Sequence, residues 1–313
     1  MAERWRDLAG PVGVLPAGAR NAITDVPGVR VGHARAASGQ RTGVTVVAPP
    51  VLPAAAGVAV VNGTGELTAA LEIAETGRME TPVHLCGTHA LGTVAQAAIE
   101  ASGHGPDAVL IPVVGECDDG DLADSRTVVA GDVHAALAAL GEEVAEGTVG
   151  AGTGMSCFDF PGGIGTASRR CGAHTVGVLL LCNFGDREYL DLLGTRLDPP
   201  ARPAASQGSC IAVCATDAPL SALQLRRLAL RPLLGLSRAG SYASEGSGEI
   251  GLAFTTAPGD LGNDALNPLF AGAYEAAHEA VLNCLVAGRP ARRLDGSMQE
   301  PFPLSAPRAP DPS

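Results

Sequence analysis

The sequence predicts a mixed α/β or α+β fold with sheets inside and helices outside. Short apolar runs typical of strands alternate with stretches of helical periodicity along the whole 313-residue chain. Most of the strand-like runs are apolar throughout instead of alternating, which predicts sheets that are covered on both faces. Because 46% of the residues are hydrophobic and only 17% are charged, the chain can bury a sizeable core.

The individual elements follow from these runs and from the Gly and Pro residues, 41 and 23 in number, that separate them. The predicted strands span residues 44–48, 57–63, 107–114, 176–182, 210–216 and 249–257. The predicted helices span residues 66–76, 88–101, 128–140, 219–231 and 263–287. Asn263 or Asp264 can cap the last of these helices.

Charge and composition exclude several classes of function. The net charge is −12 and no segment concentrates Arg with aromatic residues, so we expect no nucleic-acid partner. All 21 basic residues are Arg, and the missing Lys excludes P-loop, Schiff-base, pyridoxal phosphate and Ser-x-x-Lys chemistry. We find no signal peptide and no apolar run long enough to span a membrane, and we expect a soluble, cytoplasmic protein.

The common metal and hydrolase motifs are missing or weak. The eight Cys residues never form Cys-x-x-Cys and lie mostly in apolar runs, so we interpret them as reduced core residues. His84, Cys86 and His89 are close in sequence, but their surroundings favour a core or the start of a helix over a metal site. Neither Gly-x-Ser-x-Gly nor His-Glu-x-x-His occurs. We therefore expect no metal and no cofactor.

Two further segments have an ordinary structural interpretation. An acidic run lacks the spacing of a calcium loop and is typical of a turn after a strand; it comprises Glu116, Asp118, Asp119, Asp121 and Asp124. Glu116 itself ends the predicted strand, where binding residues often lie. The Gly-rich segment 150–155 lacks the partners of a dinucleotide fingerprint and indicates close backbone packing.

The boundary between Gly208 and Ser209 has two interpretations: an ordinary turn, which is the usual meaning of a Gly-Ser pair and also fits those at 240 and 246, or a cleavage site. Residues 186–208 are rich in Pro and Arg and predict an exposed loop or linker, and Ser209 directly precedes a strongly apolar strand. This order is typical of a self-cleaving hydrolase, because Gly leaves its carbonyl open to attack. A freed Ser would carry its own base, since an α-amine titrates near pH 7.7–8.0. The tail from about residue 301 is Pro-rich and is expected to fray.

Six segments resemble the L-aminopeptidase/D-Ala-esterase/amidase (DmpA) and β-peptidyl aminopeptidase family, in the same order from residue 21 to about 285. They are residues 21–33, 62–67, 81–92, 150–155 with 162–169, 208–220 and 238–254. The resemblance implies a four-layer αββα sandwich and one domain, 1–313, cut into chains 1–208 and 209–313. It also implies a homo-oligomer, of four or more copies.

The resemblance also assigns roles to single residues. Ser209 matches the nucleophile and new N-terminus, formed when the Gly208–Ser209 bond is cut. Asn183 matches the oxyanion-hole amide, and Ser247 and Glu249 match the hydroxyl and carboxylate that orient the nucleophile. Glu116 matches the carboxylate that receives the free amine of the substrate.

Two positions depart from the pattern of the family. Asp118 stands where the family often has an aromatic residue of the substrate or oxyanion pocket, and Gly87 replaces a common Asn. The second carboxylate beside Glu116 changes which substrates fit, and we expect it to favour basic first residues. The departures affect the substrate more than the class of reaction.

The sequence therefore predicts a self-processing serine aminopeptidase, amidase or esterase that acts on small peptides, amides or esters with a free amine. Two alternatives remain open. One is an acyltransferase of the ornithine acetyltransferase type, although those enzymes normally have a Thr nucleophile. The other is a degenerate member of the same fold that acts as a binding protein.

Overall fold

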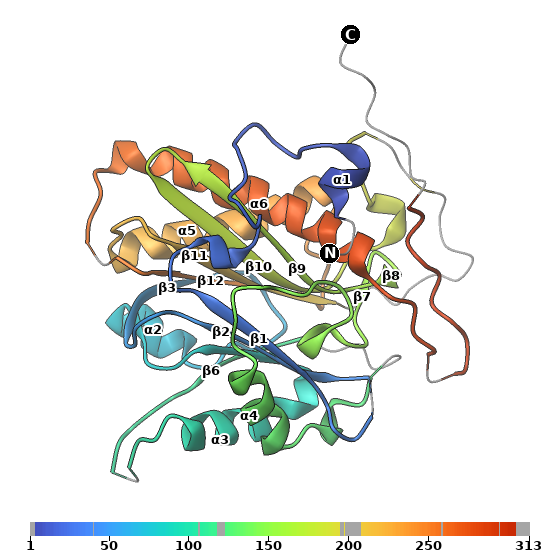
Figure 1. Ribbon diagram of the computed structural model, residues 1–313, viewed down its shortest axis with the longest axis horizontal. Helices are drawn as coiled ribbons and strands as arrows, with labels where there is room; N and C mark the ends of the chain where they lie inside the picture. The colour runs from blue at the N-terminus through green and yellow to red at the C-terminus, as the bar shows by residue number, and fades with distance from the viewer. Residues whose placement is uncertain are drawn as a thin grey trace.

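The computed structural model describes residues 4–39, 41–105, 107–117, 123–194, 197, 208–257, 259–293 and 295–304. They form four layers: one pair of helices, a six-stranded sheet, a four-stranded sheet and a second pair of helices (Figure 1). The αββα sandwich is thus confirmed. The sequence pattern explains it, because strands that are apolar on both faces need a covering layer on each side.

The six-stranded sheet has the order β4-β3-β12-β11-β10-β9. Its strands are β3 (Ala54–Gly63), β4 (Arg78–Met79), β9 (Gly163–Cys171), β10 (His174–Asn183), β11 (Ser209–Thr216) and β12 (Gly248–Thr255). β11 is antiparallel to β10 and parallel to β12. The four predicted strands of this sheet are confirmed within a few residues.

The four-stranded sheet has the order β1-β2-β5-β6. Its strands are β1 (Arg30–Arg35), β2 (Gly43–Ala48), β5 (Val83–Cys86) and β6 (Val113–Glu116). β5 and β6 run parallel, so Glu116 ends its strand beside Cys86. The sheet faces the six-stranded sheet across a core that includes Leu85 and Leu179.

Two helices cover the outer face of each sheet (Figure 1). α5 (Ala222–Leu236) and α6 (Leu266–Ala287) pack on the six-stranded sheet, and α3 (Leu91–Ala101) and α4 (Ala130–Ala138) pack on the four-stranded one. Alternate residues of β10 belong to different cores: Val178 and Leu180 face α5 and α6, whereas Leu179 and Leu181 face the other sheet. The shorter elements are α1 (Trp5–Ala9), α2 (Ala70–Thr76), β7 (Ser156–Cys157) and β8 (Phe160–Pro161).

Two predicted elements are shorter than expected. The strand expected from residue 107 begins only at Val113, because Pro112 has no N–H to donate to a ladder. The helix expected over 66–76 begins at Ala70, since the residues before it pair with β6 instead: Leu67 bridges Gly115, and Thr68 N–H donates to the carbonyl of Val114 at 2.9 Å. This pairing brings the 62–67 segment to the end of β6.

Three other expectations are wrong in part. Asn263 and Asp264 belong to a 3₁₀ turn, and α6 starts after it at Leu266 with no side-chain cap. The linker expected over 186–208 is packed in its first part, where Leu190 and Leu192 are buried; residues 195, 196 and 198–207 lie outside the described residues. In the tail, Phe302 is buried edge-on against Phe160, and residues from 305 on lie outside the description.

The structure agrees with the interpretation of the Cys residues as reduced core residues and of the Gly-rich segment 150–155 as a site of close backbone packing. All eight Cys residues lie in the described part of the chain, all are buried, and none forms a disulfide. A Cβ at Gly152 would approach the Cα of Gly163 to 2.6 Å, so the 150–155 segment does serve close backbone packing. Within the described residues, no helix has the length and apolarity needed to cross a membrane.

Candidate active site

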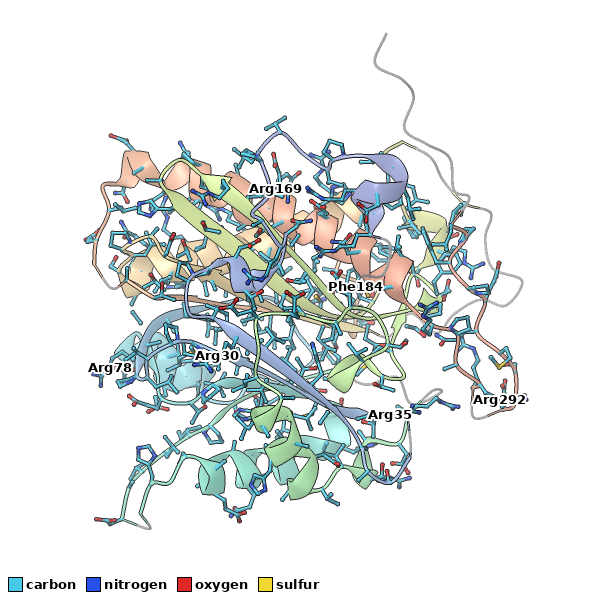
Figure 2. The ribbon with its side chains drawn as sticks, in the orientation of Figure 1. Arg30, Arg35, Arg78, Arg169, Phe184 and Arg292 are labelled. Atoms are coloured by element: carbon cyan, nitrogen blue, oxygen red, sulfur yellow. The ribbon has the colours of Figure 1, made fainter. Side chains whose placement is uncertain are left out.

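The candidate site lies where three neighbouring strands of the six-stranded sheet begin or end. Ser209 is the first residue of β11, and its backbone is in register with Asn183, the last residue of β10, and with Gly248, the first of β12. Phe184, the residue after Asn183, marks this end of the sheet in Figure 2. The register of the sheet alone therefore brings an amide side chain beside the hydroxyl of Ser209.

The peptide bond between Gly208 and Ser209 is held by the neighbouring strand. The carbonyl oxygen of Gly208 accepts a hydrogen bond from the N–H of Gly248 at 3.2 Å. A Cβ at position 208 would lie 2.4 Å from the carbonyl oxygen of Asn183 and 2.8 Å from the Cα of Phe184. Only Gly fits here, which gives a steric reason for the residue that precedes Ser209.

The Asn183 side chain is buried and oriented by a backbone contact. Its Oδ1 accepts a hydrogen bond from the N–H of Ser156, at the start of β7, at 3.0 Å. An amide whose oxygen is held in this way presents its nitrogen, a donor, on the opposite side. Such an orientation is what a preorganised oxyanion donor requires.

Ser247 and Glu249 form a buried hydroxyl–carboxylate pair. The Ser247 Oγ donates toward the Glu249 carboxylate, at 2.7 Å from Oε1 and 2.9 Å from Oε2. The Nδ2 of Asn62, at the end of β3, lies 3.3 Å from the same Oγ and 2.8 Å from the carbonyl of Ser244. Burial raises the pKa of Glu249, and the hydrogen bonds from Ser247 and Asn62 offset part of that rise.

Glu116 comes from the other sheet and is anchored through both carboxylate oxygens. Its Oε1 accepts from the N–H of Glu66 at 2.9 Å, and its Oε2 accepts from the hydroxyl of Thr88. A Cβ built on Gly65 would lie 3.4 Å from Glu116 Oε1 and 3.8 Å from Ser209 Oγ. The carboxylate and the Ser209 hydroxyl therefore border the same space.

The structure thus brings together five of the six side chains singled out in the sequence. Asp118, the sixth, lies outside the described residues. His84 and Cys86 are buried in the four-stranded sheet, whereas His89 is exposed in a short 3₁₀ helix, in agreement with their interpretation as core and helix-start residues. Within the described ranges, no group of three or more His, Cys, Asp or Glu side chains could hold a metal ion.

Sequence reasoning missed several residues that complete the site. They are Asn62 at the end of β3, Gly65 and Glu66 in the loop that follows it, Thr88 in a second loop, and Ser156. The first four lie in segments 62–67 and 81–92, which resembled the family but had no assigned role. For these four residues that match was the only sequence signal, since their hydrogen-bond partners lie 28 to 185 residues away along the chain.

Comparison with known proteins gives consistent matches over almost the whole chain. A model of peptidase family S58 matches residues 21–299. The β-peptidyl aminopeptidase BapA of Sphingosinicella microcystinivorans is 37% identical over 98% of this chain and 91% of its own length. The enzyme of the same name from Sphingosinicella xenopeptidilytica is 39% identical over 91% and 85%.

Two solved structures share the fold closely. The PH0078 protein from Pyrococcus horikoshii OT3 superposes with a TM-score of 0.89 at 35% identity, covering 96% of both chains. The L-aminopeptidase D-Ala-esterase/amidase of Ochrobactrum anthropi, described as a variant of the Ntn hydrolase fold, gives a TM-score of 0.85 at 31% identity and the same coverage. The four-layer arrangement is therefore shared with this group.

Proposed function

The chain belongs to peptidase family S58 and is an aminopeptidase, and we propose that it activates itself by cutting its own Gly208–Ser209 bond. The products would be chains 1–208 and 209–313, which together form one domain. The observation that carries the proposal is the position of Ser209 at the start of β11. Its backbone is in register with Asn183 on one side and with Gly248 on the other. Gly248 lies between Ser247 and Glu249, whose side chains form the buried pair.

The self-cleavage would begin with attack of Ser209 Oγ on the carbonyl carbon of Gly208. An ester then replaces the amide, and water hydrolyses it to the carboxylate of Gly208 and the free α-amine of Ser209. Before cleavage Ser209 has no free amine, so the Ser247–Glu249 pair on the adjacent strand would accept the hydroxyl proton. The N–H of Gly248, already bonded to the Gly208 oxygen, supports polarisation of that carbonyl.

Turnover would use the same hydroxyl with a new base. The α-amine of Ser209 takes the proton of Oγ, which attacks the substrate carbonyl, expels the amine or alcohol, and leaves an acyl-enzyme that water hydrolyses. The nitrogen of the Asn183 amide would donate to the developing oxyanion, because its oxygen is held by Ser156.

Substrate selection would depend on Glu116. The carboxylate is buried, anchored at both oxygens and borders the space next to Ser209. An ammonium group placed there would gain a charge-assisted hydrogen bond, worth about 1.5–3 kcal/mol. We infer that the substrates are small peptides, amides or esters with a free α- or β-amine, in line with the names of the matched relatives.

A comparison of substrates tests this function. We expect fast release from alanyl and β-alanyl p-nitroanilides and poor release from their N-acetylated forms, in which the positive charge is lost. Glu116→Gln should lower kcat/KM about ten- to a hundredfold for the free-amine substrates and leave the acetylated ones nearly unchanged.

The outcomes also separate the alternatives. Equal rates on free and acetylated substrates would remove Glu116 from the site. Products that form only when an acceptor amine is added would favour an acyltransferase, and a cut but inactive protein would favour a binding role. An Arg-initiated p-nitroanilide tests in addition whether Asp118 favours basic first residues.

A further inference from the structure

The segment 64–66 is fixed between the two halves of the site. The N–H of Thr64 donates to the carbonyl of Ser247 at 3.3 Å, and the N–H of Glu66 donates to Glu116 Oε1 at 2.9 Å. The carbonyl of Glu66 accepts from the N–H of Glu116 at 3.2 Å. The backbone of Gly65 is therefore held on both sides and cannot easily move away.

Gly65 packs closely against a second glycine. A Cβ on Gly248 would lie 2.6 Å from the carbonyl oxygen of Thr64 and 3.1 Å from the Cα of Gly65, so position 248 leaves no room for a side chain. This close approach brings the 64–66 segment to the first residue of β12 and hence to Ser209. The close packing of the 64–66 segment therefore explains why residue 248 is Gly.

Gly65 is different, because packing does not require it to be Gly. Its φ lies outside the left-handed region, and a Cβ there would meet nothing closer than 3.4 Å. The three nearest atoms are Glu116 Oε1 at 3.4 Å, Gly248 Cα at 3.6 Å and Ser209 Oγ at 3.8 Å. These are ordinary contact distances, so the fold would accept Ala, and the residue is exposed to solvent.

We propose that Gly65 is a specificity-determining residue: the space over it holds the carbon atoms that join the amine of the substrate to its reacting carbonyl. This inference rests on the proposed function, in which Glu116 holds the amine and Ser209 attacks the carbonyl. The ammonium would lie about 2.8 Å from Glu116 Oε1 and the carbonyl carbon about 3–3.5 Å from Ser209 Oγ. Atoms that join these two groups must pass the point that a Cβ of residue 65 would fill.

The proposal predicts how the chain length of the substrate matters. A β-amino acid has one more methylene between amine and carbonyl than an α-amino acid, so it needs more of the space over Gly65. A methyl group at residue 65 should therefore harm β-aminoacyl substrates more than α-aminoacyl substrates. An acyl ester without an amine does not need to reach Glu116 and should be affected least.

Gly65→Ala tests the proposal, with Gly63→Ala as the matched control. Gly63 lies two residues away, its φ is also outside the left-handed region, and a Cβ there would meet only Val60 Cγ1 at 3.9 Å. We expect Gly65→Ala to cut itself normally, since self-cleavage involves no group held by Glu116. Its kcat/KM should fall about tenfold for an alanyl p-nitroanilide and further for the β-alanyl one, mainly through KM, and by less than about twofold for p-nitrophenyl acetate.

Binding of β-alanine, followed by titration calorimetry, separates this inference from the proposed function. Loss of binding in Gly65→Ala but not in Gly63→Ala supports the role of Gly65, even if the wild type releases no p-nitroaniline. Equal binding and equal kcat/KM in the wild type and both variants would overturn it, as would a wild type that binds no β-alanine. A wild type that neither cuts itself nor hydrolyses free-amine substrates contradicts the proposed function alone.

Discussion

The two sheets contribute to the candidate site in different ways. The six-stranded sheet supplies Asn183 and Ser209 from the adjoining ends of β10 and β11, and their spacing is fixed by the backbone register. The four-stranded sheet supplies a single side chain, Glu116, whose position depends on hydrogen bonds from Glu66 and Thr88 in two loops.

This difference has a physical consequence for the proposed function. Groups on paired strands are held rigidly, as electrostatic stabilisation of a transition state requires. A carboxylate that loops hold can change its distance from the nucleophile when one loop residue changes. We therefore expect substitutions on the six-stranded side to lower kcat, and those around Glu116 to change KM and the choice of substrate.

The largest effect should come from Ser209→Ala. Without the hydroxyl, no ester can form at Gly208 and no acyl-enzyme can form with a substrate. Denaturing electrophoresis should show one uncut chain, and release of p-nitroaniline should fall to the background rate. A variant that still cuts between residues 208 and 209 would show that another group is the nucleophile.

Asn183→Ala should have the next largest effect. Loss of one oxyanion donor typically lowers kcat about 10²- to 10³-fold with little change in KM. Self-cleavage passes through a similar tetrahedral state, so its rate should fall as well, as a time course of freshly made protein would show. An increase in KM alone would mean that Asn183 binds the substrate and does not stabilise the transition state.

Glu249→Gln should slow self-cleavage. In the fraction that is cut it should lower kcat/KM by about a hundredfold and change the pH profile of kcat/KM. Burial raises the pKa of Glu249, so this carboxylate becomes protonated at a higher pH than usual as the pH falls. The α-amine of Ser209 is also protonated there, so the slope of log kcat/KM against pH should increase from about one to about two. In the variant this added slope should be absent; an unchanged profile would assign the acid limb to another group.

The smallest effect concerns the anchoring of Glu116. Thr88→Val keeps the shape of the side chain but removes the hydroxyl that donates to Glu116 Oε2. Because Thr88 is exposed, we expect only about a fivefold rise in KM for free-amine substrates, with kcat unchanged. Thr88→Ser is the control and should behave as the wild type. A fall in kcat without a change in KM would place Thr88 on the reaction side of the site.

The sequence predicted the site best where local pattern and global fold agree. The apolar runs in the sequence locate β10, β11 and β12, and therefore place Asn183, Ser209 and Glu249 at or next to the ends of these strands. By contrast, β9 was not predicted. Its small residues pack against a helix so closely that a Cβ on Gly165 would lie 2.0 Å from the carbonyl oxygen of Ala280, and small residues give no strand signal.

Contacts between distant loops could not be predicted in the same way. The helical pattern over 66–76 correctly predicted α2, but the helix begins only at Ala70 because the preceding residues pair with β6. The same pairing lets the N–H of Glu66 donate to Glu116 Oε1. Nothing in the local sequence around Asn62 or Thr88 specifies their partners, which lie 185 and 28 residues away. Such residues can be recognised only when the fold has brought them together.

Intact-mass measurement with N-terminal sequencing of the purified wild-type protein tests the central claim most directly. The whole chain has a mass of 31.4 kDa, and cutting after Gly208 should give fragments of about 21 kDa and about 10.5 kDa, in proportion to length. The smaller fragment should begin with Ser209, followed by Cys210 and Ile211. A preparation that hydrolyses free-amine substrates while it remains a single uncut chain would contradict the account.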